Sequence, residues 1–146
     1  MSLESDVYTY LKSRAALTAL LGTGDNFRLY PQRVPPSPTY PVVRYVVVSQ
    51  PRTAYTHDNA GAPPAGTTIV RTRMQFDIWD SPDSEGGYEA VLAVRAALVA
   101  ELSGFKGVMG ATSIQSCFIA DSKDDFEPDS GSNRRTVDAV LKHEEG

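Results

Sequence analysis

The chain has 146 residues, is 41% hydrophobic, and has a formal net charge of −4 at pH 7 from 14 basic and 18 acidic side chains. This length fits one domain, residues 1–146, and the mild acidity disfavours a dedicated nucleic-acid-binding module, which usually has a basic excess. The single cysteine, Cys117, excludes an intrachain disulfide, and the acidic start and short apolar runs predict a soluble protein that is neither exported nor membrane-bound.

The N-terminal segment has apolar residues at near-helical spacing from Leu3 to Leu21, and Gly22 follows as a helix stop. The pattern is interrupted at Ser13, so the segment is either one helix or two short helices with Ser13 capping the second. Residues 28–31 are a candidate short strand. The prolines at 35–38 exclude a helix there.

Two strands are predicted next, Val42–Val48 and Thr68–Trp79, separated by the Pro- and Gly-containing segment 49–66. Loops of that length in compact domains tend to be functional or disordered. The second strand alternates with period two, which predicts a core side and a polar side. The polar side carries Arg71, Arg73, Gln75 and Asp77.

The C-terminal half is predicted to contain a helix and two further strands. Ser81-Pro82 is a helix-start signal, an apolar stripe runs from Tyr88 to Leu102, and Gly104 ends the helix. The remaining segments are a loop marked by Gly107 and Gly110, a strand Ile114–Ala120, an acidic loop Asp121–Ser132 and a strand Arg135–Leu141.

The element order helix, strand, strand, helix, strand, strand (α-β-β-α-β-β) predicts an α+β fold with two layers. We expect a four-stranded, mainly antiparallel sheet with two helices on one face. The other face would stay open to solvent or to a partner, and its residues are Arg44, Arg71, Arg73, Gln75, Asp77, Asp138 and Lys142.

The residue types that usually carry chemistry do not converge in the sequence. His57 and His143 are isolated, and Cys117 lies in an apolar strand that favours an inert core thiol. The acids of the 121–129 stretch do not have the spacing of a calcium loop. We therefore predict no catalytic residue, no metal site and no cofactor.

Two segments are candidate contact sites. The arginines of the polar strand side either pair with Asp77 and Asp138 across strands or dock a neighbouring subunit of complementary charge. In the long loop, Arg52, Tyr55 and His57 have the residue types of an interface anchor and are expected to order on contact with a neighbouring subunit or a tube; the alternative is a mobile tip without a partner.

An ordered series of segments resembles one known family, the tail-completion or tail-terminator proteins of long-tailed bacteriophages and prophages. The resemblance extends from Asp6 to Lys142. Its segments are Asp6-Val7-Tyr8, Ala15-Ala16-Leu17, Arg28-Leu29-Tyr30-Pro31, Tyr40-Pro41-Val42-Val43-Arg44-Tyr45, the strand from Arg71 to Trp79, Val94-Arg95-Ala96-Ala97-Leu98, Asp125-Phe126-Glu127-Pro128 and Arg134-Arg135-Thr136-Val137-Asp138.

This resemblance implies a structural virion protein, a minor tail component assembled in the bacterial host cytoplasm. It implies a homohexameric ring that caps the finished tail tube, stops tube polymerisation and offers a surface for the head connector or neck protein. The major tail-tube protein would be a further partner, and DNA would pass through without specific binding. An acidic ring interior would repel the phosphate backbone; the candidate channel-lining acids are Asp121, Asp124, Asp125, Glu127 and Asp129.

Three alternatives remain at this point. A neck adaptor or head-closure protein would share the task of joining head and tail. A small enzyme or ligand-binding domain would use His57 or Cys117. A regulatory nucleic-acid-binding protein is disfavoured by the acidic balance.

Overall fold

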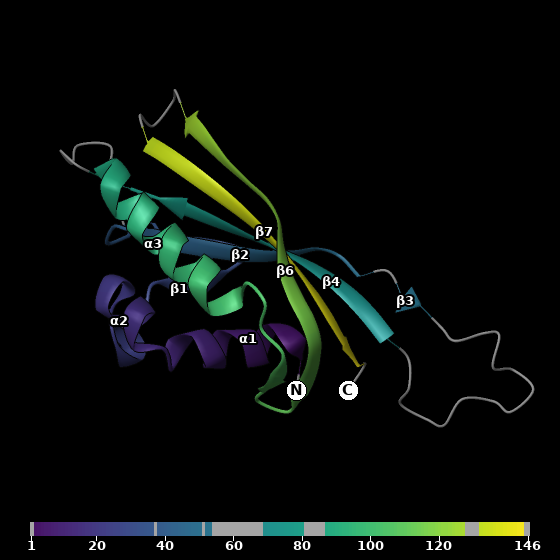
Figure 1. Cartoon of the computed structure of the whole chain (residues 1–146). Coiled ribbons are helices and arrows are strands. Elements are labelled where there is room, and N and C mark those ends of the chain that lie inside the picture. The colour runs from purple at the N-terminus through teal and green to yellow at the C-terminus, as the bar shows by residue number, and fades with distance from the viewer. Residues whose placement is uncertain are drawn as a thin grey trace, which may run out of the picture.

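The computed structural model describes residues 2–36, 38–50, 52–53, 69–80, 87–127 and 132–144, with only the backbone described at residues 52, 53, 87, 125–127, 132, 133 and 144. The elements follow in the order α1 (Leu3–Lys12), α2 (Ala15–Leu21), the 3-10 turn η1 (Gly24–Asn26), β1 (Leu29–Pro31), β2 (Val42–Ser49), β3 (Arg52–Thr53), β4 (Ile69–Trp79), α3 (Gly87–Leu102), β5 (Gly107–Met109), β6 (Thr112–Glu127) and β7 (Ser132–Glu144). The three α-helices of this described part lie on one side of a twisted sheet (Figure 1).

The sheet is mixed rather than uniformly antiparallel. Six strands follow one another in the order β1-β2-β4-β7-β6-β5, and the short β3 pairs with β4, so the described residues form seven strands. The pair β1–β2 is parallel, and the other pairs are antiparallel. The four long strands β2, β4, β7 and β6 are neighbours in that order and provide most of the sheet surface.

The predicted four-stranded sheet with two helices is therefore wrong. The expected sheet did not include the candidate strand at residues 28–31, which is β1, and the sequence does not predict β3 or β5, because two or three residues give no measurable alternation. The third long strand was predicted to end at Ala120, whereas β6 continues to Glu127. Five of the seven residues of that extension, 121–127, are charged, which hides its period, although its backbone pairs with β7 throughout.

The N-terminal segment forms two helices, as one of the two alternatives had it, but Ser13 does not cap the second. Ser13 is the C-cap of α1, and its hydroxyl donates to the carbonyl of Tyr10 at 2.6 Å. The N-cap of α2 is Arg14, which makes no side-chain capping bond. At the other end of α1, the Ser2 hydroxyl accepts a hydrogen bond from the Ser5 amide, which satisfies one free donor of the first turn.

One apolar cluster joins the helices to the sheet. Buried side chains from all three helices, such as Leu11, Leu17 and Leu98, meet the alternate residues Phe76 and Leu141 of the central strands. The helices cover only one side of the sheet, so the buried apolar residues of the long strands gather mainly on that side. The predicted helix start at residues 81–86 lies outside the described residues, and α3 is described from Gly87.

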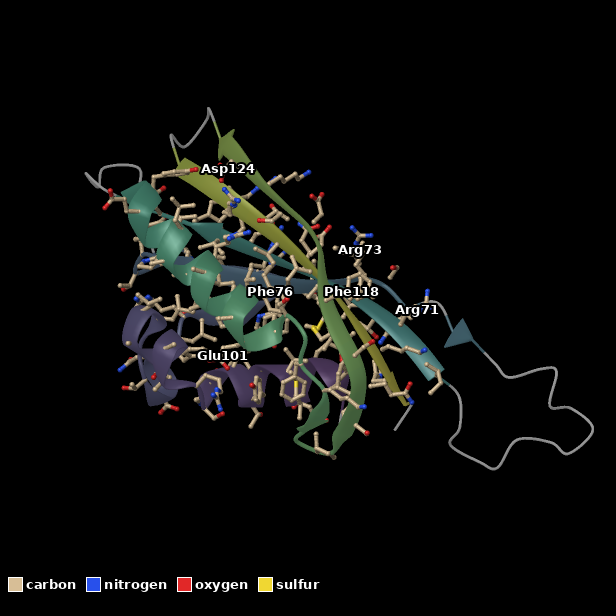
Figure 2. The ribbon with its side chains drawn as sticks, in the orientation of Figure 1. Arg71, Arg73, Phe76, Glu101, Phe118 and Asp124 are labelled. Atoms are coloured by element: carbon tan, nitrogen blue, oxygen red, sulfur yellow. The ribbon has the colours of Figure 1, made fainter. Side chains whose placement is uncertain are left out.

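A single carboxylate connects the three helices. Glu101, near the end of α3, forms a 2.7 Å ion pair with Arg14 and accepts a 3.2 Å hydrogen bond from the Tyr10 hydroxyl. The Arg14 guanidinium also lies over the Tyr10 ring, 5.4 Å from its centre. Figure 2 shows Glu101 between α3 and the N-terminal helices.

A second polar contact fixes α1 to the turn between β5 and β6. Asp6 is buried, and its carboxylate accepts a hydrogen bond of 2.5 Å from the Thr112 hydroxyl. Gly110 in that turn has a φ of 57°, and a Cβ added there would collide with the Asp6 carboxylate. Glycine is therefore required by both conformation and space.

Candidate functional site

Two of the side chains considered as reactive groups in the sequence, Cys117 and His143, are described by the structure, and both are buried. Burial raises the pKa of the Cys117 thiol to about 12, so the thiol stays protonated at neutral pH. His143 is buried and shares a 2.7 Å hydrogen bond with the Thr72 hydroxyl, whereas His57 lies outside the described residues. Among the described side chains, no group of three or more His, Cys, Asp or Glu could hold a metal ion. No described helix is both long and apolar enough to cross a membrane.

The sheet surface away from the helices is rich in polar side chains. On β4, Met74, Phe76 and Ile78 belong to the core, so the alternate residues point to the other side. Cross-strand partners share a face of the sheet, which extends this surface to the neighbouring strands. We call it the open face, and it comprises Arg44, Arg71, Arg73, Gln75, Asp77, Phe118, Asp138, Val140 and Lys142.

A buried carboxylate organises one part of the open face. The Asp77 side chain has no solvent exposure, yet it lies on the side of the sheet away from the core cluster. It forms an ion pair with Arg44 and accepts hydrogen bonds from the Gln75 amide at 3.0 Å and the Thr136 hydroxyl at 2.8 Å. The Arg44 guanidinium also lies 5.3 Å from the centre of the Trp79 ring. Asp77 is thus enclosed by its own donors, and Arg44 is held in a fixed position at the surface.

A second ion pair lies further along the same face. Arg73 donates to Asp138 at 2.9 Å, and both side chains retain some exposure, 40% and 15% respectively. The other oxygen of Asp138, Oδ1, is buried without a hydrogen-bond partner among the described residues. This pair is therefore less completely satisfied than the one at Asp77.

The open face also carries an exposed aromatic side chain. Phe118 is 53% exposed and is the cross-strand partner of the half-buried Val140, which in turn lies beside Arg73. Figure 2 places Phe118 on β6 where that strand crosses the sheet, with Arg71 and Arg73 nearby on β4. An aromatic residue next to arginine is a common composition at the centre of protein–protein interfaces.

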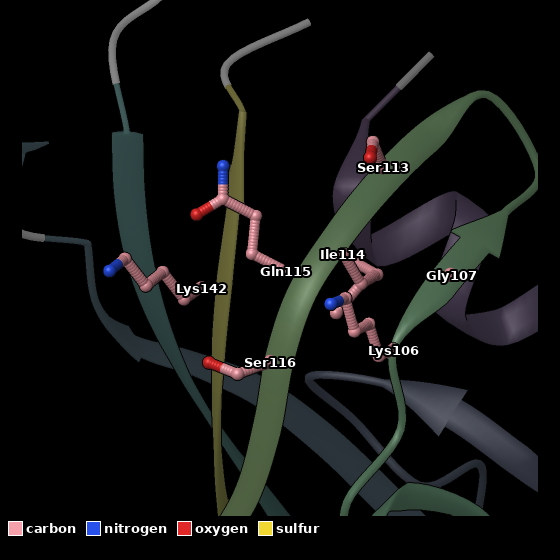
Figure 3. Close-up of a pocket in the computed structure, with 7 residues that line it drawn as sticks. All are labelled: Lys106, Gly107, Ser113, Ile114, Gln115, Ser116 and Lys142. Carbon is pink, nitrogen blue, oxygen red and sulfur yellow. The ribbon is translucent and has the colours of Figure 1, made fainter.

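One end of the open face is basic. Arg71 and Lys142 are directly opposite each other on β4 and β7, and neither has an ion pair with a described residue. Lys142 also lines a groove with a volume of about 490 Å³ that extends to Lys106, with Lys106 and Lys142 on either side of β6 in Figure 3. We call this the cationic groove; its lining is Lys106, Gly107, Ser113, Ile114, Gln115, Ser116 and Lys142.

The acidic segment at the other end of β6 is divided between the two faces. Asp121 pairs in register with Asp138 and is exposed on the side of the open face. Asp124 points to the helix side, where it accepts 2.7 Å hydrogen bonds from the Tyr88 hydroxyl and from Arg135. The hydrogen bond from Tyr88, with the Arg135 guanidinium, lowers the pKa of Asp124.

The open face and the cationic groove are surfaces that a binding partner can contact. Comparison with known proteins identifies the family to which the chain belongs. The family model described as tail completion protein gp17 matches residues 5–141. The chain belongs to this tail completion family. The resemblance inferred from the ordered segments is thereby confirmed, and the protein is a phage tail completion protein, a structural protein of the tail or neck.

A solved structure supports the fold of this tail completion protein. A chain from the virion of a native gene transfer agent particle superposes with a TM-score of 0.69 at 18% sequence identity, covering 99% of this chain and 96% of that chain. At this identity the match shows a shared fold. No curated protein matches the sequence significantly.

The structure brings together one set of the residues that the sequence analysis proposed for interfaces. Arg71, Arg73, Gln75 and Asp77 share the open face, but Asp77 is enclosed and acts there by positioning Arg44. The side chains of Arg52, Tyr55 and His57 lie outside the described residues, as do those of Asp125, Glu127 and Asp129.

Two surface features of this tail completion protein were missed. Phe118 was assigned to an apolar strand as a whole, although alternation from the buried Cys117 would have placed Phe118 on the opposite side. The cationic groove was missed because Lys106 and Lys142 are 36 residues apart in sequence, and only the pairing of β5, β6 and β7 brings them together. No local pattern indicates such a long-range contact.

Proposed function

We propose that this protein caps the finished tail tube as a ring of identical subunits, stops tube polymerisation and provides the surface on which the head is joined. The family match over residues 5–141 is the observation that carries this proposal. A homohexamer is the stoichiometry that the family resemblance implies. The proposed partners are neighbouring copies, the major tail-tube protein and the head connector or neck protein.

The open face supports a contact role over a catalytic one. Its charges are arranged in cross-strand rows, and the Asp77 carboxylate accepts hydrogen bonds from Arg44, Gln75 and Thr136, which fixes the position of Arg44. Such prearranged charges give register and partner choice more than raw affinity. Phe118, 53% exposed beside them, would supply the apolar part of a contact.

The non-enzymatic part of the proposal can be tested directly. Cys117 and His57 are the residues on which a small enzyme or ligand-binding domain would depend. We expect the double variant C117A/H57A to assemble infectious particles in normal yield. A loss of infectivity in particles that contain the variant at normal copy number would support the enzymatic alternative.

A gene-deletion experiment distinguishes the proposed capping role from the role of a head-closure protein. Electron microscopy of particles from a host in which the gene is deleted should show overlong or unfinished tails detached from capsids. DNA-leaking heads with tails of normal length would instead identify a neck adaptor or head-closure protein. Tails of normal length already fastened to filled capsids would exclude both functions.

The DNA path is a further part of the proposal. Acidic side chains facing it would repel phosphate and let DNA slide. Of the five candidate acids, Asp121 is exposed, whereas Asp124 is engaged by Tyr88 and Arg135 on the helix side. We therefore expect D121N to slow DNA ejection more than D124N; equal and normal ejection by both variants would argue against acids of this segment lining the path.

A further inference from the structure

The cationic groove and the strand beside it concentrate positive charge that the fold itself does not require. Arg71 and Lys142 are cross-strand partners, and like charges in that position destabilise a sheet. Lys106 adds a third cation on the other side of β6 (Figure 3). None of the ion pairs between described residues involves these three side chains. This local concentration contrasts with the net charge of −4 of the whole chain, and it indicates an anionic partner.

The three cations form a row across the strands of the sheet. Arg71 on β4, Lys142 on β7 and Ser116 on β6 are consecutive cross-strand partners. Lys106 directly precedes β5, which pairs with β6. Adjacent strands lie about 4.8 Å apart, so the three strand spacings from Arg71 to Lys106 extend about 14 Å across the sheet. A row of this length fits an extended polyanion better than a single small anion.

The lining of the groove has the composition of a phosphate contact. Lysine, serine and glutamine side chains all donate to the phosphate oxygens of DNA in protein complexes. The described lining contains two lysines, two serines and one glutamine, and no acidic residue is among it. The centre of a protein–protein interface has a different composition, because aromatic residues are enriched there and lysine and serine are depleted. The lining therefore favours a nucleic-acid backbone over an acidic polypeptide.

We propose that the cationic groove contacts the phosphate backbone of duplex DNA, independently of base sequence. Each DNA strand has one phosphate per about 3.4 Å of the helix axis, so a row of about 14 Å spans the phosphates of about four nucleotides. Contacts to phosphate position a protein on DNA without reading its sequence. The choice of DNA rests on the proposed function, which places the protein beside the DNA path. The net negative charge of the chain keeps the contact weak and reversible.

The salt dependence of DNA binding measures how many phosphates the groove neutralises. Each neutralised phosphate contributes about −0.9 to the slope of the logarithm of the binding constant against the logarithm of the salt concentration. Three cations should give the native chain a slope of about −2.7, so a fourfold rise in salt should weaken binding about 40-fold. The slope can be measured by fluorescence anisotropy of a labelled duplex titrated with the purified chain between about 25 and about 100 mM salt.

Neutral substitutions then locate the contact on the molecule. K106Q/K142Q leaves one of the three cations, so the same rise in salt should weaken DNA binding only about 3–4-fold. The matched control K12Q/K123Q removes two lysines that do not line the groove and lowers the net charge of the chain by the same amount. It should keep the slope of the native chain. Circular dichroism of both variants verifies that they are folded.

Three results would overturn the proposal. The first is the absence of DNA binding by the native chain at the lowest salt concentration. The second is a slope that K106Q/K142Q leaves unchanged, or that K12Q/K123Q reduces equally. The third is tighter binding of labelled poly-L-glutamate than of a duplex with the same number of charges, which would identify an acidic polypeptide as the occupant of the groove.

The same measurements separate the DNA contact from the capping role. Absence of DNA binding, together with overlong tails in the gene deletion, would refute the contact and leave the capping function in place. The expected slope and its loss in K106Q/K142Q, together with tails of normal length in the deletion, would support the contact and refute the capping role.

Discussion

The buried carboxylate of the open face permits a quantitative comparison of two substitutions. D77A removes an unexposed acid that accepts from Arg44, Gln75 and Thr136. Breaking a buried ion pair typically lowers the free energy of unfolding by about 3–5 kcal/mol. For D77A we expect a loss of about 3 kcal/mol, because Arg44 remains 29% exposed to water. Its matched control, D138A, breaks the half-exposed pair with Arg73 and should cost about 1 kcal/mol or less.

Urea unfolding provides the measurement for both variants. Circular dichroism should follow the transition, with the fluorescence of Trp79, the single tryptophan, as a second probe. In a parallel thermal unfolding experiment, D77A should lower the melting temperature by about 6–12 °C, whereas D138A should lower it by about 4 °C at most. Equal losses for D77A and D138A would refute the argument that burial of the Asp77 cluster sets its contribution.

Three further predictions concern titration and backbone conformation. Burial raises the pKa of Cys117 to about 12, so the folded chain keeps a proton that the unfolded chain loses above about pH 8.5. The free energy of unfolding should therefore fall by about 1.4 kcal/mol between pH 7.5 and 9.5. The urea midpoint of C117A should not show this part of the pH dependence. The hydrogen bond from Tyr88 lowers the pKa of Asp124, so its stabilising contribution is present above about pH 4 and is lost as the pH falls; Y88F should therefore have a lower urea midpoint than the native chain at pH 6, with the difference disappearing towards pH 2–3. Both Gly104 and Gly110 have positive φ, which costs a larger residue about 1–2 kcal/mol, but only Gly110 also lacks room; G110A should thus lower the thermal midpoint clearly more than G104A, and equal shifts would show that the contact with α1 yields easily.

The long elements could be predicted from the sequence because each carries a strong local pattern. The strand from Ile69 to Trp79 alternates over its whole length, and its polar residues lie on the open face as expected. The stripe from Tyr88 to Leu102 lies within α3. In both cases the spacing of the apolar side chains along the sequence determines which surface of the element packs against the core.

The errors come from places where long-range pairing determines the structure. β6 extends through the largely charged segment 121–127 because β7 supplies a backbone pairing partner for each of its residues, and charged side chains do not prevent that pairing. β1 is held by its parallel pairing with β2, over only three residues. Local propensity contains no information on either partner.

The candidate surface was predictable only in part, for the same reason. Arg71 and Arg73 follow from alternation within one strand. The enclosure of Asp77 requires Arg44 and Thr136 from the two neighbouring strands, and the cationic groove requires Lys106 from beyond α3. Contacts of that separation are visible only once the order of strands is known.

The shared carboxylate of Glu101 has a mechanical consequence for a subunit under load. Because Arg14 and Tyr10 both bind it, the first two helices and the third are coupled at one point behind the sheet. When a neighbouring component pushes on the exposed side of the strands, the helical layer should resist as one stiff plate rather than as separate cylinders that slide past each other. Slower amide exchange in all three helices together, lost in E101A, would be the signature of that stiffness.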